Sequence, residues 1–374
     1  MHNKNILLLY ITEVSGHHSA SLAIEKSLKA ISADLKILNL NAFHYTSPIS
    51  EKVVNRIYTT VIKRTPKIWD FVYDNPKVKK SIDKFKNAIN KFNSPKLKRL
   101  FDQFRPDIVV CTQAYPCGMV AQFKKTYQSK VPLVGVLTDF IPHSYWLYDN
   151  VDYYICPSQE ISRRLAEKGI PEHKIKPLGI PFDPGFLTPV NKPAVLEKLG
   201  FSAEKKTVLI MGGGQGLGPI KTIVQSLDRV KSDFQEIIIT GTNKKLYKSL
   251  KKDLKKFKKK ICLLGYVHNV NELMSVSDLI ITKPGGITTS EALSKGLPML
   301  IIKPIPGQEA NNTVYLTEQK AALKIVKPKE INLIVENLFT NPEKLKRISE
   351  ACSRIAKPSA GTDIARFILS LSHV

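Results

Sequence analysis

The sequence predicts an α/β protein with two tandem Rossmann-like, doubly wound domains that face a cleft. Apolar, β-branched strand patterns alternate with helical patterns in both halves of the chain. A stretch rich in proline and glycine, without any period, separates the halves at 179–193. We therefore expect a first domain over 1–178, a linker over 179–193 and a second domain over 194–374. The last helix is expected to pack back on the first domain.

The expected strands are short apolar runs, as is typical of parallel strands buried on both faces. In the first half a helix is predicted over Ser19–Ala30, directly after the first run. The runs of the first half are "NILLLYI", "LKILNL", "DIVVCT", "PLVGVLT" and "DYYICPS". Those of the second half are "TVLIMGGG", "EIIITGT", "ICLLGYV", "DLIITKPGG" and "PMLIIKP".

Length and composition limit the class of protein. The chain has 374 residues, 43% of them hydrophobic, and its apolar runs fall far short of the ~20 residues that a membrane-spanning helix needs. The first apolar run is also too short for a signal-peptide core, so we expect a cytoplasmic protein. The five cysteines form no C-x-x-C pair and have no zinc-site spacing, which predicts reduced thiols and no structural metal.

The charge of the chain is strongly positive. There are 57 basic and 32 acidic residues, a net charge of +25, which attracts polyanions such as anionic lipid or nucleic acid. An AT-rich coding sequence, with much Lys, Asn and Ile, would explain part of this excess. It does not explain why the stretch from Lys77 to Arg99 carries nine basic residues and one acidic residue.

Two basic stretches have a helical apolar stripe. One spans 77–99, where five apolar residues from Val78 to Phe92 recur at spacings of three and four. The other spans 244–260 and has leucines at the same spacing. Either stretch can be a solvated helix of a domain. The helix over 77–99 also has the pattern of a membrane-surface contact, and we leave open whether it inserts.

Two histidines, His17 and His18, stand at the turn after the first predicted strand, in "LLLYITEVSGHHSASLAI". One interpretation is a polar loop or a helix cap. The other is a catalytic base at the mouth of an active site, because imidazole titrates near neutral pH.

The second half opens with a glycine cluster, "VLIMGGGQGLGPIKT", between a strand pattern and a helix pattern. Bare backbone N–H groups and a helix N-terminus at such a junction can bind a phosphate. Pro219 occupies the lysine position of a P-loop, and no register gives G-x-G-x-x-G. Tight strand–helix turns also use glycine for steric reasons alone, so both interpretations stay open.

A second cluster lies in "SDLIITKPGGITTSEALSKGLPMLIIKPIPGQEANN". Glu291 follows the glycine pair there and suits the hydroxyls of a ribose, or it is only a charge near the helix start. Amide and carboxylate groups in "PGQEANN" suit a polyhydroxylated sugar. The candidates in this region are Gly286, Thr288, Thr289, Glu291, Gln308, Glu309 and Asn312.

These motifs together resemble the monogalactosyldiacylglycerol synthase and processive diacylglycerol glucosyltransferase family. That family has the GT-B fold and is related to the peptidoglycan N-acetylglucosaminyltransferase. In the first half, "SGHHSASLAI" is similar to the family turn G-x-G-H-x-x-A-A-x-A-I. "VLTDFIPHSYW" is similar to its T-D-F-x-x-H-x-x-W segment. The resemblance covers nearly the whole chain, although this chain has Val14-Ser15 where the family turn has more glycine.

The resemblance implies roles for individual residues. His17 aligns with the presumed base, and Tyr266 and Val267 with the residues that hold uracil. Glu291 would bind the ribose, and Gln308 and Glu309 the hexose. The backbone near the two glycine clusters would hold the UDP diphosphate, and these residues are Gly213, Gly214, Gln215, Gly216, Gly286, Thr288 and Thr289.

The first domain would also bind the acceptor. Asp139 is the second candidate for the base, or it orients His17, or it only caps a turn. Gly16, His143 and Trp146 are candidates for the acceptor site, and Trp146 alternatively belongs to the core. Because the sequence contains no Asp-x-Asp, we predict metal-independent displacement with inversion at the anomeric carbon and no cofactor besides the UDP-sugar donor.

The predicted function is transfer of a glucose or galactose from a UDP-sugar to diacylglycerol at the inner face of the cell membrane. The expected partners are UDP-hexose, diacylglycerol and an anionic membrane surface, and no nucleic acid is expected. The alternative enzyme uses a polyprenyl-linked cell-wall intermediate as acceptor. Two further alternatives are a nucleic-acid-binding protein that uses the positive field and a catalytically inactive sugar-nucleotide sensor.

Overall fold

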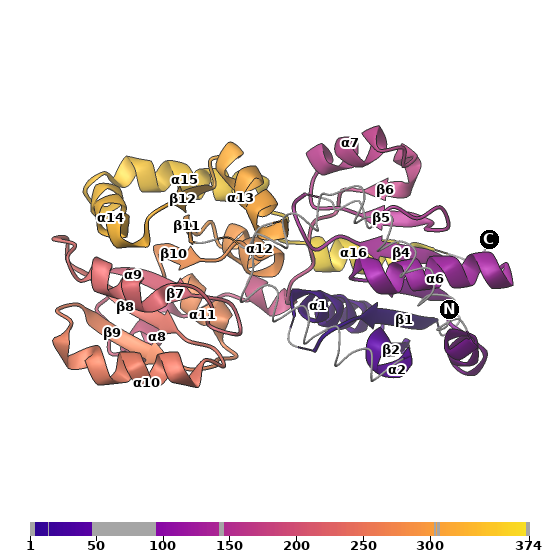
Figure 1. Cartoon of the computed structure of the whole chain (residues 1–374), viewed down its shortest axis with the longest axis horizontal. Helices are drawn as coiled ribbons and strands as arrows, with labels where there is room; N and C mark the ends of the chain where they lie inside the picture. The colour runs from indigo at the N-terminus through magenta and orange to yellow at the C-terminus, as the bar shows by residue number, and fades with distance from the viewer. Residues whose placement is uncertain are drawn as a thin grey trace. The chain divides into compact units, whose positions relative to one another are not determined.

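The computed structural model describes residues 4–13, 15–46, 95–141, 146–302, 304 and 307–371. It divides into two compact units (Figure 1). The first comprises Met1–Pro184, Ile305–Gln308 and Ser359–Val374, and the second comprises Gly185–Pro304 and Glu309–Pro358. Most of the predicted basic helix, 77–94, lies outside the described residues, as does His143.

The first unit contains a six-stranded parallel sheet with the strand order β2-β1-β3-β4-β5-β6. The strands are β1 Asn5–Tyr10, β2 Lys36–Asn41, β3 Ile108–Cys111, β4 Leu133–Val136, β5 Tyr153–Ile155 and β6 Ile175–Lys176. The helices are α1 Gly16–Ile31, α2 Ala42–Thr46, a helix over 95–104, α6 Ala114–Tyr127, α7 Gln159–Glu167, the 3₁₀ helix η2 Glu172–Lys174 and α16 Ala360–Ser370.

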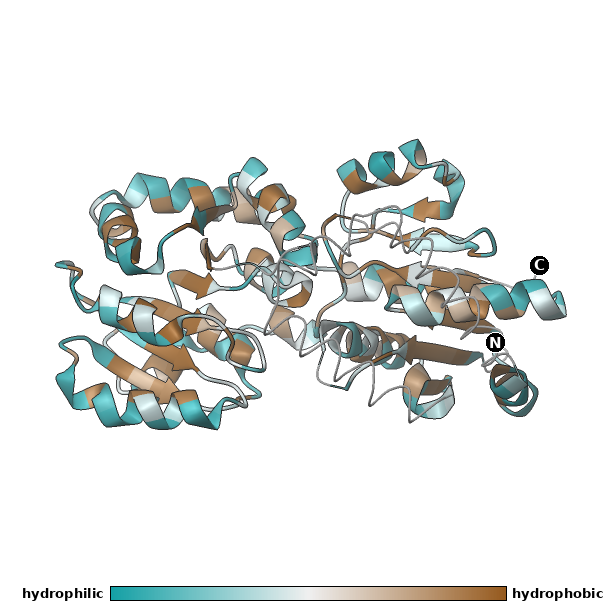
Figure 2. Ribbon diagram, viewed as in Figure 1, coloured by the Kyte–Doolittle hydropathy of each residue, from teal (hydrophilic) through white to brown (hydrophobic). Residues whose placement is uncertain are grey.

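Alternate residues of β1 belong to two different cores, because successive side chains of a strand point to opposite faces. Leu7 and Leu9 belong to a cluster with residues of α6 and α7. Ile6 and Leu8 belong to a cluster with residues of α1 and α16. Helices therefore cover both faces of the sheet, and the C-terminal helix α16 packs in the first unit. In Figure 2, β1 and β4 of this sheet are brown, whereas α6 and α7 carry teal on their outer faces.

The second unit contains another six-stranded parallel sheet, with the order β12-β11-β10-β7-β8-β9. Its strands are β7 Lys206–Met211, β8 Phe234–Ile239, β9 Lys260–Leu264, β10 Leu279–Thr282, β11 Met299–Ile302 and β12 Ala322–Ile325. Its α-helices are α8 Lys192–Lys198, α9 Ile220–Leu227, α10 Lys244–Asp253, α11 Val270–Ser275, α12 Gly286–Ser294, α13 Gln308–Glu318, α14 Ile331–Thr340 and α15 Pro342–Ile355, and its 3₁₀ helices are η3 Pro184–Leu187, η4 Leu254–Lys256 and η5 Pro328–Glu330.

The prediction of two doubly wound α/β units is confirmed. Each strand order reverses once, between β1 and β3 in the first sheet and between β7 and β10 in the second. Ligands of such open parallel sheets bind outside the carboxyl ends of the strands at this reversal. The chain segments that follow these four strands are therefore the places to look for a site.

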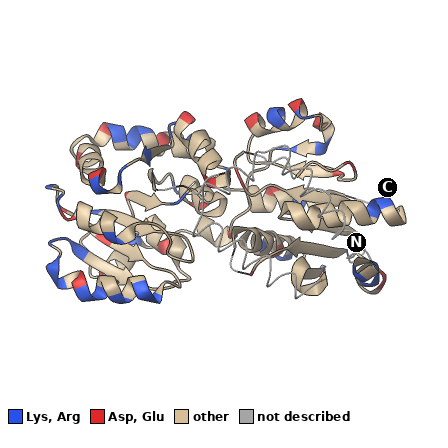
Figure 3. Ribbon diagram, in the orientation of Figure 1, with Lys and Arg blue, Asp and Glu red and all other residues tan. Residues whose placement is uncertain are grey.

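The basic stretch 244–260 forms α10, η4 and the start of β9. Figure 3 shows lysines along the outer side of α10, while Leu250 is buried. In the described part of the chain, no helix combines the length and the hydrophobicity that crossing a membrane requires.

Candidate active site

His17 lies in the first turn of α1, directly after the end of β1. The helix begins at Gly16 because the Ser15 hydroxyl caps it, accepting the N–H of His18 at 3.2 Å. The predicted helix over Ser19–Ala30 was therefore too short at its start. Both histidines belong to the helix rather than to a loop, which fixes the direction of their side chains.

Two neighbouring strands hold the His17 ring. Its Nδ1 lies 3.0 Å from the carbonyl oxygen of Thr112, which follows β3, and 2.9 Å from the Thr138 hydroxyl, which follows β4. The Thr112 hydroxyl donates in turn to the His17 carbonyl at 2.8 Å. A carbonyl oxygen only accepts, so Nδ1 carries the proton and Nε2 keeps its lone pair. This tautomer is the one that a base acting through Nε2 requires.

The environment of His17 favours the neutral ring. Burial lowers its pKa below the usual 6.5, and this effect exceeds the opposing effects of the Asp139 charge and the Thr112 carbonyl. Asp139 is thus near enough to act on His17 electrostatically. A neutral imidazole at pH 7 can accept a proton.

His18 has a different environment. Its ring stacks on Tyr10 with 4.2 Å between the centroids, and its Nδ1 lies 2.7 Å from the carbonyl oxygen of Glu13. The Tyr10 hydroxyl donates to the Glu13 carboxylate at 2.8 Å. These contacts give His18 a role in holding the turn before α1.

The other acceptor-site candidates lie in three different settings. Gly16 is exposed at the start of α1, and His143 is outside the described residues. Trp146 is only 4% exposed and belongs to the core cluster with Leu133 and Tyr154. This burial favours the alternative that Trp146 is a core residue, and its role in the acceptor site stays a prediction.

The glycine loop after β7 presents backbone N–H groups. Gly213 and Gly216 have positive φ angles of 70° and 56°, and a Cβ on Gly216 would lie 2.0 Å from the Thr240 carbonyl oxygen. The N–H of Gly216 donates to the Gly213 carbonyl within the loop. The N–H groups of Gly213, Gly214 and Gln215 donate to no protein acceptor in the described residues. These three are the ones available to an anion.

The helix α12 offers a second set of donors, after β10. Its N-cap is Gly285, which has no side chain to accept the N–H groups of the first turn. Thr288 lies in that turn. Thr289 is fully buried, and its hydroxyl has no hydrogen-bond partner among the described residues. Glu291 is partly buried on the next turn. An anion at this helix start would meet both the dipole and unpaired donors.

Gln308 and Glu309 are the first two residues of α13. The Glu309 carboxylate forms an ion pair of 2.7 Å with Lys283, and both side chains are largely buried. Lys283 follows β10 in the "KPGG" motif, but the sequence analysis did not single it out. Its position between the end of a strand and the glycine pair, with only Pro284 intervening, was the available signal.

Asn312 is fully buried. Its side chain is 0% exposed, and its Nδ2 donates to the Pro284 carbonyl at 2.9 Å. This bond ties α13 to the loop after β10 and indicates a positioning role, while contact of Asn312 with the donor stays a prediction.

Tyr266 and Val267 follow β9. Tyr266 is 56% exposed, and its ring meets His268 edge-on with 5.2 Å between the centroids. An exposed aromatic ring can stack on a flat base. Among the described residues no group of three or more His, Cys, Asp and Glu could hold a metal ion.

Comparisons with known proteins identify the family and the fold of this chain. The monogalactosyldiacylglycerol (MGDG) synthase family model matches residues 17–182, and the glycosyltransferase family 28 C-terminal domain matches residues 207–362. The fold resembles that of Acinetobacter baumannii MurG, with a TM-score of 0.66, 14% identity, and coverage of 98% of this chain and 100% of that chain. UDP-GlcNAc 2-epimerase from Neisseria meningitidis, solved with UDP-GlcNAc bound, has a TM-score of 0.60 at 17% identity, with coverage of 98% and 100%. The fold and the family models define a GT-B glycosyltransferase.

Sequence relatives narrow the class further. A processive diacylglycerol β-glucosyltransferase of Bacillus pumilus is 30% identical, over 93% of this chain and 90% of the relative. The protein of the same name from Bacillus cereus is 30% identical, over 100% and 95%. This chain belongs to the processive diacylglycerol β-glucosyltransferase family, as its motifs predicted, and is a glycolipid glycosyltransferase.

Proposed function

We propose that this protein transfers a hexose from a UDP-sugar to the hydroxyl of diacylglycerol, with inversion at the anomeric carbon and without a metal ion. The observation that carries the proposal is the His17 ring, held through Nδ1 at the reversal point of the first sheet with Nε2 left as the base. The names of the relatives support diacylglycerol as the acceptor.

The chemical step is a single displacement. His17 Nε2 takes the proton of the lipid hydroxyl while the hydroxyl oxygen forms a bond to the anomeric carbon. The bond from that carbon to the UDP phosphate oxygen breaks, and UDP leaves with its electron pair. A positioned base typically contributes ~10²–10⁴ in rate, and attack from the face opposite UDP inverts the configuration. The Asp139 charge stabilises the imidazolium that forms.

The second unit would stabilise the leaving UDP. The free N–H groups of Gly213, Gly214 and Gln215 and the start of α12 suit the diphosphate. Thr288 and Thr289 would add hydroxyl donors there. We assign Glu291 to the ribose hydroxyls, and Tyr266 with Val267 to the uracil.

The hexose would meet Gln308 and Glu309. The ion pair with Lys283 holds the Glu309 carboxylate in one orientation, and Asn312 fixes the helix that carries it. Metal independence is supported by the sequence, which has no Asp-x-Asp motif. The positively charged chain would act at the anionic inner surface of the cell membrane, to which each basic residue near the surface adds ~1 kcal/mol of attraction.

The test uses the purified full chain with labelled UDP-glucose or UDP-galactose and vesicles that contain diacylglycerol. We expect labelled glycolipid with one of the donors, in the presence of a chelator, and faster transfer when the vesicles contain anionic lipid. The anomeric configuration of the product reports inversion. No transfer to diacylglycerol, or transfer only to a polyprenyl phosphate acceptor, would contradict the proposal.

A further inference from the structure

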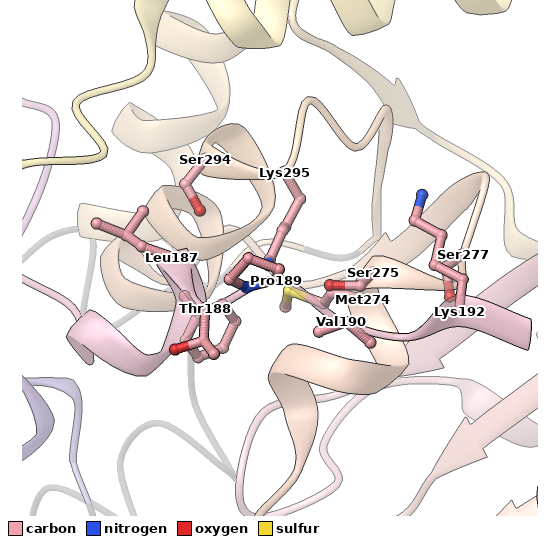
Figure 4. A pocket seen from close by; sticks show the side chains of 11 residues that line it. Leu187, Thr188, Pro189, Val190, Lys192, Met274, Ser275, Ser277, Ser294 and Lys295 are labelled. Carbon is pink, nitrogen blue, oxygen red and sulfur yellow. The ribbon is translucent and has the colours of Figure 1, made fainter. Parts of the chain in front are cut away.

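A cavity of about 320 Å³ lies in the second unit, away from the residues discussed above (Figure 4). The segment after η3 and the start of α8 line one side of it, and α11 and the end of α12 line the other. Its lining includes Ser277, just before β10, and Lys295, just after α12. A helix that connects two parallel strands runs back toward their amino ends. Both residues therefore lie at the edge of the sheet where the strands begin. The donor-site candidates follow the carboxyl ends of the strands.

The cavity carries positive charge that no carboxylate balances. Two lysines, Lys192 and Lys295, are among its eleven lining residues, and none of the eleven is acidic. Neither lysine forms an ion pair within the part of the chain that the structure describes. Burial, and secondly the repulsion from Lys192, lower the pKa of Lys295. A bound anion would relieve both effects.

A buried hydroxyl adds a second, independent observation. Ser275 is 8% exposed, and its Oγ has no hydrogen-bond partner among the described residues. The other two serines of the lining are satisfied, since Ser277 and Ser294 each donate to a backbone carbonyl at 2.7 Å. An unpaired buried hydroxyl is unfavourable by ~1–3 kcal/mol, so a partner from outside the chain would stabilise it.

Apart from Thr188, the remaining lining is apolar. Figure 4 shows the Lys295 side chain extending from the end of α12 toward Pro189, with Ser275 and Met274 on the facing helix. The Lys295 Nζ also lies 5.9 Å from the centroid of the Phe186 ring. A ligand here would meet cations and a hydroxyl beside a hydrophobic surface, and the volume suits a small molecule.

We propose that this cavity binds a phosphate group, whose oxygens accept from the Lys295 ammonium and the Ser275 hydroxyl. Lys192 contributes its charge from the start of α8, and Phe186 and Met274 contact the organic part of the ligand. A phosphate monoester in solution and the headgroup of an anionic phospholipid share this chemistry. The site is independent of the catalytic assignments made above.

Competitive acylation of lysines followed by mass spectrometry tests the proposal on the full-length protein. The arms contain buffer alone, inorganic phosphate, phosphatidylcholine vesicles, or the same vesicles with phosphatidylglycerol. We expect phosphate or the phosphatidylglycerol vesicles to slow acylation of Lys295 at least threefold. The exposed Lys346 on α15 should acylate at the same rate in all arms. If inorganic phosphate slows the acylation of Lys295, a soluble phosphate is sufficient to occupy the cavity. If only the phosphatidylglycerol vesicles slow it, the ligand is the lipid headgroup. Equal Lys295 rates in all four arms would overturn the proposal.

Variants locate the effect in the cavity. Ser275→Ala should raise the concentration of anion needed for half-protection of Lys295 by about tenfold or more, as loss of one hydrogen bond to a charged group predicts. Lys192→Gln should raise it as well, whereas the matched control Lys346→Gln should not. Alanine is a good helix former, so Ser275→Ala is expected to keep its thermal unfolding midpoint. If the anion protects Lys295 in both cavity variants at the same concentration as in the wild type, the phosphate does not bind in this cavity.

Discussion

The two units have similar sheets but different chemistry at the point where the strand order reverses. In the first unit this point carries an imidazole, held by a carbonyl and a hydroxyl from the neighbouring strands. In the second it carries glycine loops, in one of which the backbone N–H groups of Gly213, Gly214 and Gln215 have no acceptor among the described residues. Proton transfer needs a titratable side chain in one tautomer, and diphosphate binding needs bare backbone donors. The same architecture thus carries different chemical groups in its two units, and the roles we propose for the units differ accordingly.

The largest effect is expected at the imidazole. His17→Ala should lower kcat by ~10²–10⁴, because it removes the base and leaves the glycine loops unchanged. His18→Ala is the matched control, one position further along the same helix turn, and should keep kcat within a few-fold. Transfer assays and titration with UDP measure the two sites separately. If kcat fell equally in both variants, His17 could not be distinguished from His18 as the base.

A buried carboxyl in the second unit lies in the sheet interior rather than at its edge, and it should affect stability only. Glu236 on β8 is fully buried, and neither of its carboxyl oxygens has a hydrogen-bond partner in the described residues. Burial, with a smaller contribution from the Asp228 charge, raises its pKa to about 8. The folded protein therefore keeps this proton over a pH range in which the unfolded chain, with a pKa near 4.5, has lost it.

Stability linked to Glu236 is complete below the unfolded pKa and is lost as the pH rises toward 8. Glu236→Gln removes this titration. Relative to the wild type, we expect the free energy of unfolding of the variant to rise by roughly 3 kcal/mol between pH 5 and pH 8. Denaturant unfolding at both pH values measures the change, with the exposed Glu204→Gln as control. A difference independent of pH would mean that Glu236 is ionised in the fold.

Two glycines, one in each unit, allow the role of the loop after β7 in binding UDP to be tested separately from the need for glycine in its backbone conformation. Gly213 and Gly169 both have positive φ, 70° and 91°, and a Cβ on either would meet nothing within 4 Å. Alanine at either site should destabilise the protein similarly, by ~1–2 kcal/mol. Only Gly213→Ala should weaken UDP binding, by about tenfold, because its Cβ would occupy the space proposed for the diphosphate. Calorimetric titration with UDP checks this, and equal affinities for the two variants would contradict the assignment.

The sequence carried enough information to predict the fold and to nominate candidate site residues, but not to predict the contacts that hold those residues in place. Strands and tight turns are determined by residues that are close together in the sequence. Apolar runs and glycine clusters therefore predict them directly. The contacts of Thr112 and Thr138 with His17 join segments about 95 and 121 residues away, and no local pattern encodes them. The burial of Trp146 and Asn312 is likewise set by the packing of the whole unit, which a local pattern does not encode.

The smallest expected effect concerns Asp139, and it distinguishes three roles. The Asp139 charge raises the pKa of His17, so Asp139→Asn should lower that pKa further. The acid limb of the pH profile of kcat/KM, which lies below pH 6.5, should then move to lower pH. The exposed Asp149→Asn should leave the limb in place. If Asp139 were itself the base, kcat would fall by ~10² or more at every pH. If it only capped a turn, thermal stability would fall and the profile would keep its shape.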